Sequence, residues 1–443
     1  MVSATCRDST AAQDAEPNRA RRTVCRVSSD QPRPETAAEF TARVRAAFPA
    51  LSDTGDGTAY FDGPGGSQVP AVVARAVADA MTAGLSNRGT VTASERRAEE
   101  VVVAARAALG DLLGSDPRGV VLGRSMTQLT FDVARTLADD WGPGDEVIVT
   151  TLDHDANLRP WVTWAQRAGA TVKRLGFDPV TAELDDVTPL LSDRTRLVAV
   201  TAASNLFGTR PDVRAIADAA HTSGALVYVD AVHLTPHAVV DRAALGADFL
   251  ACSPYKFFGP HLGAVAADPA LLEILRPNKL LPSTDTVPER FELGTLPYEL
   301  LAGVTAAVDF IADLAPGTAT TRRERIVASM THLEVHEGAL FSTLLHALAG
   351  IDGVTLHGNA THRTPTALFS VAGRTGREVH EALATEGVNA PASHFYALEA
   401  SRHAGLGDAG AVRAGLAPYT SESDVERLLT GVGRLAAAAS SVP

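Results

Sequence analysis

The chain has 443 residues, of which 45% are hydrophobic and 21% charged, and its formal net charge at pH 7 is −13. The length suffices for a large domain and a smaller one, each with its own core. The negative charge disfavours nucleic acid and anionic membranes as partners, and no run of roughly 18 apolar residues predicts a membrane span. The cysteines Cys6, Cys25 and Cys252 form no disulfide framework. This pattern predicts a reducing compartment, the cytoplasm.

Residues 1–35 are polar, charged and poor in aromatic side chains. Such a composition predicts a disordered extension. Arg19, Arg21 and Arg22 resemble the basic start of a signal peptide, but no apolar segment follows them, so a leader is not expected.

Two predicted helices flank a loop rich in glycine and proline. Apolar residues at helical spacing predict one helix from Thr36 to Phe48 and another from Val69 to Ala83, with a longer one over 92–110. Residues 60–67 read Tyr-Phe-Asp-Gly-Pro-Gly-Gly-Ser. This loop either lets the backbone approach a ligand closely or is an ordinary surface loop. We assign residues 36–75 to an N-terminal helix and an active-site loop.

Strands and helices alternate from residue 119 to residue 265. Strands are predicted over 119–123, 146–151, 171–177, 197–203, 227–229 and 251–253, and helices over 124–141, from 158, and over 211–223. The alternation predicts a parallel sheet with helices on both faces. Residues 76–304 are therefore predicted to form a large domain. Residues 305–443, with a long helix from about 305 and strands over 366–371 and 412–416, are predicted to form a small one.

Charged residues follow two of the predicted strands. Asp230 ends the run Val227–Val229, and Lys256 follows a second apolar run just after Pro254. Open α/β sheets bind ligands at the carboxyl ends of their strands. A buried carboxylate and a lysine at two such ends suit pyridoxal phosphate. The lysine amine forms the Schiff base, and the acid pairs with the pyridinium nitrogen.

With these residues the chain resembles fold-type I pyridoxal-phosphate enzymes of the class V aminotransferase group, and within it the cysteine desulfurase-like proteins. The resemblance covers about residues 55–435. It implies a large domain with a mostly parallel seven-stranded sheet between helices and a smaller α+β C-terminal domain. It also implies pyridoxal 5′-phosphate as cofactor, an amino acid substrate, a homodimer and no metal.

The resemblance assigns residues to the cofactor phosphate. Ser125, Met126 and Thr127 open a helix whose backbone N–H groups can bind an anion, although Met126 replaces a threonine of the family. Ser253 matches another phosphate ligand. Thr295, in a Gly-Thr motif, matches a threonine that reaches the cofactor of the partner subunit.

Further residues are assigned to the cofactor ring by the same resemblance. Lys256, His154 and Asp230 are the expected catalytic residues, with His154 stacked on the ring and Asn157 supporting it. Read alone, His154 could equally be a buried core histidine. The ring hydroxyl is expected to meet Asn205 and His233, and His233 replaces the usual glutamine. Tyr255 replaces a histidine beside the lysine.

The substrate is expected to meet Arg413, Asn205, Gly65, His394 and Tyr396. Arg413 matches the family's arginine that holds the substrate carboxylate, for which a planar guanidinium fork is suited. His394 and Tyr396 lie where desulfurases carry a mobile loop with a nucleophilic cysteine, and no cysteine follows Cys252.

The missing thiol predicts the reaction. Lys256 can take the proton from the substrate Cα, and a thiol on Cβ can then leave without a protein nucleophile. We therefore expect C–S bond β-elimination from an S-conjugated cysteine, in a secondary-metabolite pathway such as antibiotic biosynthesis. The alternatives are decarboxylation-dependent oxidative deamination of that substrate, cleavage of selenocysteine or cysteine sulfinate, transamination, epimerisation, and a non-catalytic dimeric scaffold.

Overall fold

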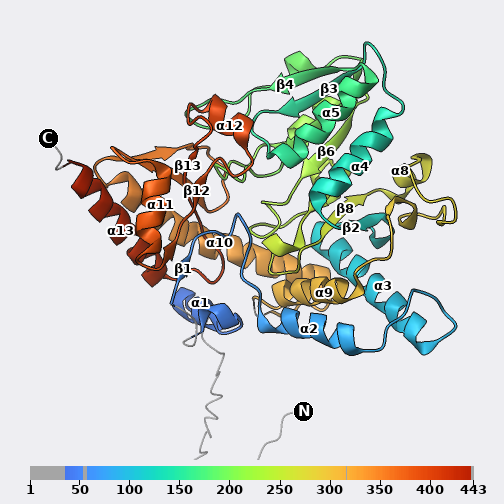
Figure 1. Cartoon of the computed structure of the whole chain (residues 1–443), viewed down its shortest axis with the longest axis horizontal. Helices are drawn as coiled ribbons and strands as arrows, with labels where there is room; N and C mark the ends of the chain where they lie inside the picture. Colours follow the sequence, from blue (N-terminus) through green and yellow to red (C-terminus); the bar gives the residue numbers. More distant parts are fainter. Residues whose placement is uncertain (1–34, 53–56, 316, 441–443) are drawn as a thin grey trace, which may run out of the picture. The chain divides into compact units, whose positions relative to one another are not determined.

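The computed structural model describes residues 35–52, 57–315 and 317–440, shown in Figure 1. Residues 37–443 form one contact unit, and residues 1–36 are assigned to another. The extension predicted over residues 1–35 falls, except for Glu35, outside the described residues. Among the described helices, none is long and apolar enough to cross a membrane.

A seven-stranded sheet carries the candidate site. Its strands follow the order β2-β8-β7-β6-β5-β3-β4, and the five from β7 to β4 run parallel, while β8 is antiparallel to both its neighbours. The mostly parallel seven-stranded sheet predicted from the sequence is therefore confirmed. The strands are β2 (Val120–Gly123), β3 (Glu146–Thr150), β4 (Thr171–Leu175), β5 (Thr195–Thr201), β6 (Leu226–Asp230), β7 (Phe249–Cys252) and β8 (Gly263–Ala267).

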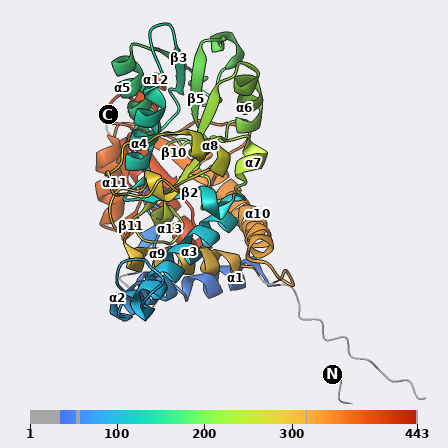
Figure 2. The same cartoon turned by 90° about the vertical axis from the view of Figure 1, so that its right-hand side faces the viewer.

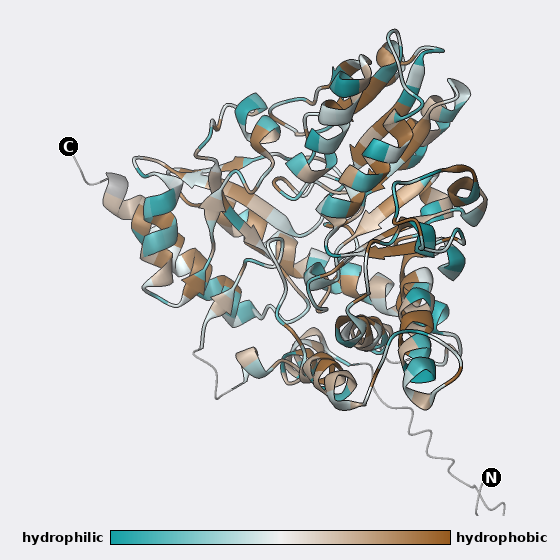
Figure 3. Cartoon of the chain, turned by 45° about the vertical axis from the view of Figure 1, so that its right-hand side comes forward, coloured by the Kyte–Doolittle hydropathy of each residue, from teal (hydrophilic) through white to brown (hydrophobic). Residues whose placement is uncertain are grey.

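Alternate side chains of each strand enter two different cores. In β6, Tyr228 packs with α4 (Met126–Ala138) and α5 (Arg159–Ala168), whereas Val227 and Val229 pack with α3 (Ala93–Leu113) and α6 (Val213–Thr222). Figure 2 shows α5 and α6 on opposite sides of β3 and β5. Burial on both faces explains the continuous apolar runs of these parallel strands, which Figure 3 shows between helices with polar outer surfaces.

A smaller antiparallel sheet follows in the C-terminal part. Its order is β12-β13-β10-β9, with β9 (Val354–His357), β10 (Thr366–Val371), β12 (Ala392–Ser393) and β13 (Ala411–Gly415). Its core includes side chains of α10 (Arg322–Ala349), α11 (Gly376–Ala384) and α13 (Glu422–Ser440). Near this sheet, β1 (Ala59–Tyr60) pairs with β11 (Val388–Asn389), which joins the N-terminal loop to the C-terminal part. The remaining helices are α1 (Ala37–Arg45), α2 (Ala71–Thr82), α7 (Arg242–Leu245), α8 (Pro269–Ile274) and α12 (Leu398–His403).

The single long helix predicted from about residue 305 is wrong. The structure has α9 (Tyr298–Ala312) and α10 (Arg322–Ala349) instead. The segment between them contains Pro316 and Gly317, which are disfavoured within helices. The predicted boundary at 304–305 falls inside α9. Helix α10 joins the two halves, because its first turns pack beside α9 and its last turns under the small sheet.

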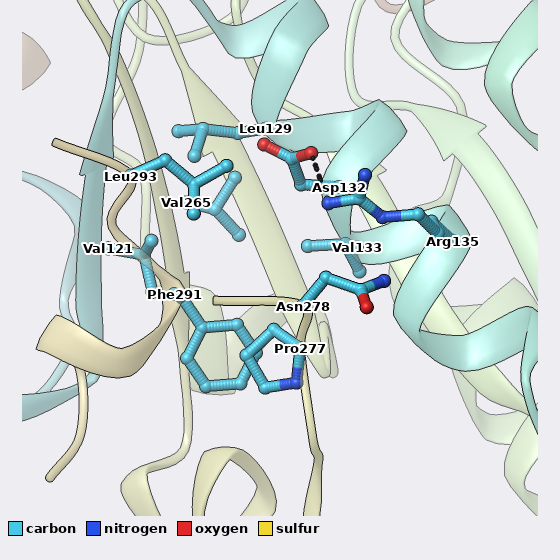
Figure 4. A pocket seen from close by; sticks show the side chains of 10 residues that line it. All are labelled: Val121, Leu129, Asp132, Val133, Arg135, Val265, Pro277, Asn278, Phe291 and Leu293. Carbon is cyan, nitrogen blue, oxygen red and sulfur yellow. Dashed lines mark hydrogen bonds and ion pairs between the residues drawn. The ribbon is translucent and has the colours of Figure 1, made fainter. Parts of the chain in front are cut away.

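A buried ion pair anchors the loop before α9. Arg106 of α3 donates to both carboxylate oxygens of Glu292 at 2.7 Å, and Glu292 also accepts from the N–H of Leu122 in β2. The two side chains are 7% and 5% exposed. On the same loop, Phe291 and Leu293 close a small, mostly apolar cavity against β2, β8 and α4, with Asp132 and Arg135 paired at its edge, as Figure 4 shows.

We expect Glu292→Leu to lower the free energy of unfolding by about 3 kcal/mol, because it leaves the Arg106 charge buried with only the more exposed Glu289 as partner. Urea denaturation measures this loss. Glu289→Leu should cost less, and Arg106→Met combined with Glu292→Leu should recover much of the stability. A double variant no more stable than Glu292→Leu would contradict this account.

Candidate active site

Four residues that follow large-sheet strands meet at one edge of the sheet. Asp230 is the last residue of β6 and is paired with Thr201 of β5 and Ala251 of β7. Lys256 lies in the short turn Pro254–Lys256 after β7. His154 and Asn205 follow β3 and β5. The parallel arrangement places all these strand ends on the same side, as the sequence predicted.

The Lys256 amine is buried close to other charged side chains. It donates a hydrogen bond to the Pro64 carbonyl of the glycine-rich loop, and its nitrogen lies 4.9 Å from the centre of the Tyr255 ring. Burial, followed by the nearby Arg413 cation, lowers the pKa of Lys256 to about 7, although Asp230 acts in the opposite direction. A large fraction of this amine is therefore neutral, and so nucleophilic and basic, near neutral pH.

Asp230 and His154 have pKa values shifted by burial. Burial raises the pKa of Asp230 to about 6, opposed by the Val232 N–H, which donates to its Oδ1 at 2.9 Å, and by Lys256. Burial, followed by Lys256, lowers the pKa of His154 to about 4. The Nδ1 of His154 accepts from the Ala156 N–H at 3.0 Å. Near neutral pH the site thus presents a carboxylate, an uncharged imidazole ring and a half-neutral amine.

The support predicted for Asn157 takes a definite form. Its amide donates to Asp153 at 2.7 Å and accepts from the indole N–H of Trp161 at 3.0 Å. Asp153 also accepts from the backbone N–H of Thr201 at the end of β5. Asn157 therefore ties the loop carrying His154 to the neighbouring strand end.

Several buried polar atoms around the amine lack a hydrogen-bond partner in the part of the chain that the structure describes. They include Oδ1 of Asn205, Nδ1 of His233, Oδ1 of Asp62 and Nε of Arg413. The opposite nitrogen of His233, Nε2, lies 3.0 Å from the hydroxyls of both Thr364 and Thr366. Buried polar groups normally have partners, so these atoms indicate a polar ligand, and those of Asn205 and His233 fit a ring hydroxyl.

The residues expected at the cofactor phosphate lie at the start of α4. Ser125 caps the helix by accepting from the Gln128 N–H at 3.1 Å, Met126 is buried and Thr127 is exposed. Gly263 of β8 allows this turn to approach, because a Cβ there would lie 2.1 Å from the Met126 nitrogen. Ser253 is buried at the end of β7, but Thr295 is exposed on its loop. Thr295 stays a prediction for the partner subunit.

Arg413 of β13 enters the site from the small sheet. It is 2% exposed, donates to the Asn205 carbonyl at 2.7 Å, and its guanidinium carbon lies 3.7 Å from the centre of the Phe395 ring. Burial lowers the pKa of Arg413 to about 9. A Cβ added to Gly65 would lie 3.5 Å from its Nη2, so Gly65 borders the guanidinium. Half of the guanidinium fork is thus open to a ligand.

The segment from His394 to Ala397 lies over His154. The Tyr396 carbonyl accepts from the Asp155 N–H at 2.8 Å, and the Phe395 carbonyl accepts from the Asn205 amide at 2.9 Å. The Tyr396 ring is 71% exposed and stacks near His154, with 5.6 Å between ring centres. Phe395 and Tyr396 both have positive φ, at 49° and 60°, which is uncommon for residues other than glycine. The segment therefore carries strain that its contacts offset.

Sequence reasoning missed Asp62 and Phe395. Asp62 is the one charged residue of the glycine-rich loop at 60–67, so its position there was the available signal. Phe395 had no such signal, because its contact with Arg413 depends on the left-handed backbone at this position.

Comparisons with known proteins agree with this geometry. The family "Aminotransferase class-V" matches residues 59–428. The chain is 36% identical to an uncharacterized protein of Mycobacterium tuberculosis over 89% of this chain and 98% of that one. It is 30% identical to a probable cysteine desulfurase of Pseudomonas aeruginosa, over 88% and 97%. A crystal structure of a cysteine desulfurase from Escherichia coli has a TM-score of 0.76 at 29% identity, over 89% of this chain and 98% of that one.

We expect Lys256→Met to raise the free energy of unfolding of the ligand-free protein, and to do so most below pH 7. Because the folded pKa of Lys256 is about 7 and its ordinary value is 10.5, the charged amine opposes folding fully below pH 7. That penalty fades as the pH rises from about 7 to about 10.5, and the advantage of the variant should fade with it. Urea denaturation at several pH values checks this.

Lys279→Met is the matched control, because Lys279 pairs with the exposed Asp285. It should show no comparable gain below pH 7. An equal advantage of Lys256→Met at pH 6 and pH 10 would contradict the burial account.

Proposed function

The chain belongs to the class-V aminotransferase family, and from this premise we propose that it is a lyase that eliminates a thiol from Cβ of an S-conjugated cysteine. Members of this family use pyridoxal 5′-phosphate. When bound, the cofactor supplies an electron sink for the charge that develops at Cα.

The observation that carries the proposal is the side chain at position 396. The segment over His154 offers the phenol of Tyr396, and a phenol is a far weaker nucleophile than a thiolate. Cys252 is the only cysteine among the described residues, and its burial raises the pKa of its thiol. With no thiolate placed to accept sulfur in the part of the chain that the structure describes, a sulfur atom leaves most simply as the substrate's own thiol.

The residues of the site support distinct roles. Lys256 would hold the cofactor covalently and, once its amine is free, take the Cα proton, for which a pKa of about 7 suits it. Asp230, ionised above about pH 6, would face the ring nitrogen. The uncharged ring of His154 would cover one face of the cofactor. Asn205 and His233 each present an unpartnered atom suited to the ring hydroxyl.

Arg413 would bind the substrate carboxylate. Its Nη1 is occupied by the Asn205 carbonyl, and its Nε is unpartnered, so the open side of the fork can accept a carboxylate. Gly65 and His394 lie on the two segments that border this region, namely the glycine-rich loop and the segment over His154. Tyr396 is expected to contact the group attached to sulfur.

A homodimer is also part of the proposal. Thr295 and Leu293 are exposed on the loop that the Arg106–Glu292 pair anchors. An exposed threonine on a rigid loop is available to a second subunit, and Leu281 of the preceding segment is 97% exposed. These features support a contact in which Thr295 completes the phosphate site of the partner.

We expect S-alkyl and S-sugar conjugates of L-cysteine to yield one thiol, one pyruvate and one ammonia per substrate when incubated with the cofactor-loaded protein. Water is the only other reactant needed. Mass spectrometry of the products measures this, with Lys256→Ala as the inactive control. L-cysteine itself should leave no persulfide on the protein.

Other products would overturn the elimination. A persulfide on Cys252 together with alanine would indicate a desulfurase, and a 2-oxo acid that keeps its sulfur would indicate transamination. Release of carbon dioxide would indicate decarboxylation. Failure to develop any cofactor absorbance would favour a non-catalytic scaffold.

We expect Arg413→Lys to raise KM at least about tenfold, because an ammonium cannot reproduce the guanidinium fork toward a carboxylate. The visible absorbance of the bound cofactor should be unchanged, since Arg413 acts on the substrate. Steady-state kinetics and an absorbance spectrum test both statements.

Arg363→Lys is the matched control for this variant. Arg363 is partly buried, whereas Arg413 is fully buried. Arg363 donates to the backbone carbonyls of Gly358, Phe207 and Thr366. It should lower stability and leave KM within about twofold of the wild type. Wild-type kinetics in Arg413→Lys would remove Arg413 from the carboxylate site.

A further inference from the structure

The loop that carries the Pro64 carbonyl also places a buried carboxylate in the site. Asp62 follows β1, and its backbone forms a parallel bridge with Gly415, two residues after Arg413. Its Oδ2 accepts from the Asn389 amide at 2.8 Å. Its Oδ1 is buried and has no partner among the described residues. One half of this carboxylate is therefore fixed by Asn389, and the other half is unpaired.

The electrostatic neighbours of Asp62 are the two cations of the site. Burial raises the pKa of Asp62, and Arg413 and Lys256 oppose that rise. In the described part of the chain, however, Asp62 forms no ion pair with either cation. The adjoining turn lies between Asp62 and Arg413. The Gly65 N–H donates to the Asp62 carbonyl at 2.7 Å, and Gly65 itself borders the Arg413 guanidinium.

An unpaired carboxylate near an unpaired guanidinium is the complement of a zwitterion. Burying either charge without a partner is costly. An α-amino acid offers both missing partners on adjacent atoms, with its carboxylate for the open side of Arg413 and its ammonium for Oδ1 of Asp62. An ammonium held there would also lie close to Lys256, where the amine must react.

We propose that Asp62 binds the α-ammonium of the incoming substrate through Oδ1 and so favours α-amino acids over simple carboxylates at this site. This assignment deepens the proposed function and rests on it for the carboxylate bound to Arg413. Asn389 acts as a positioning residue, because it fixes the carboxylate through Oδ2.

The competing account makes Asp62 only a counter-ion of Arg413. In that case Asp62 would compete with every carboxylate for the guanidinium, and its removal would strengthen the binding of amino acids and simple carboxylates alike. The proposal requires the opposite for amino acids, so the two accounts separate by experiment.

The test uses the cofactor-loaded protein and two probes without a leaving group on Cβ, L-alanine and propanoate. Titration followed by the visible absorbance of the cofactor gives the Kd of L-alanine, and competition against it gives the Ki of propanoate. We expect Asp62→Asn to raise the Kd of L-alanine at least about tenfold, because it removes a charge-assisted hydrogen bond. The Ki of propanoate should stay within about twofold or fall.

Asp155→Asn is the matched control, because it removes a carboxylate near His154 that already pairs with Arg159. It should change the ratio of Kd to Ki by less than about twofold. If Asp62→Asn fails to fold or to bind cofactor, Asp62→Glu keeps the charge and should keep the wild-type preference for L-alanine over propanoate.

An unchanged Kd of L-alanine in Asp62→Asn, or stronger binding of both probes, would overturn the proposal, as would a folded Asp62→Glu that lost the preference. None of these measurements requires elimination. If S-conjugated cysteines yield no thiol while L-alanine behaves as expected, the proposed reaction fails and the role of Asp62 stands.

Discussion

The site depends on burying two cations and two carboxylates, contributed by the large sheet and by segments of the C-terminal part and the glycine-rich loop, without direct ion pairs between them. Burial lowers the pKa values of both Lys256 and Arg413, and the nearby Arg413 cation lowers that of Lys256 further. Asp230 and Asp62 are each held by a neutral donor, the Val232 N–H and the Asn389 amide. Direct ion pairs would stabilise the empty site but block it, because a ligand would then have to displace them. Instead, Oδ1 of Asp62 and Nε of Arg413 have no hydrogen-bond partner among the described residues, and these atoms define the ligand that fits.

Burying these charges lowers the free energy of unfolding, and the packing of the large sheet offsets that loss. Its central strands bury both faces, and successive side chains of β6 enter different cores. The strand end is therefore fixed by packing on two sides, and the Val232 N–H then holds the Asp230 carboxylate. Asn157 likewise fixes the loop that carries His154, because it donates to Asp153, which in turn accepts from the Thr201 N–H at the end of β5. The unfavourable free energy of burying the charges is thus offset by packing and hydrogen bonds outside the site.

The parts of this architecture that depend on local sequence could be predicted. Apolar runs that end in Asp230 and before Lys256 identify strands and their carboxyl ends, so the sheet and its catalytic edge follow from residue order. The break between α9 and α10 was missed, although Pro316 and Gly317 signalled it. The contacts of His233 and Asp62 could not be found this way. Thr366 and Asn389, which decide which atom of each is left free, lie far away in the sequence.

The two sheets contribute different residues to the site. The large sheet supplies Lys256, Asp230 and His154, to which we assign the contacts with the cofactor, whereas the small sheet supplies Arg413 and the segment with Phe395 and Tyr396. That segment adopts a backbone that costs of order 1–3 kcal/mol per residue, and it is held by the Asp155 N–H, the Asn205 amide and the Arg413 cation. Every one of these contacts is made to a residue at the site. The conformation of the segment and the state of the site are therefore linked, so the backbone that positions Tyr396 over His154 also positions Phe395 against the guanidinium of Arg413.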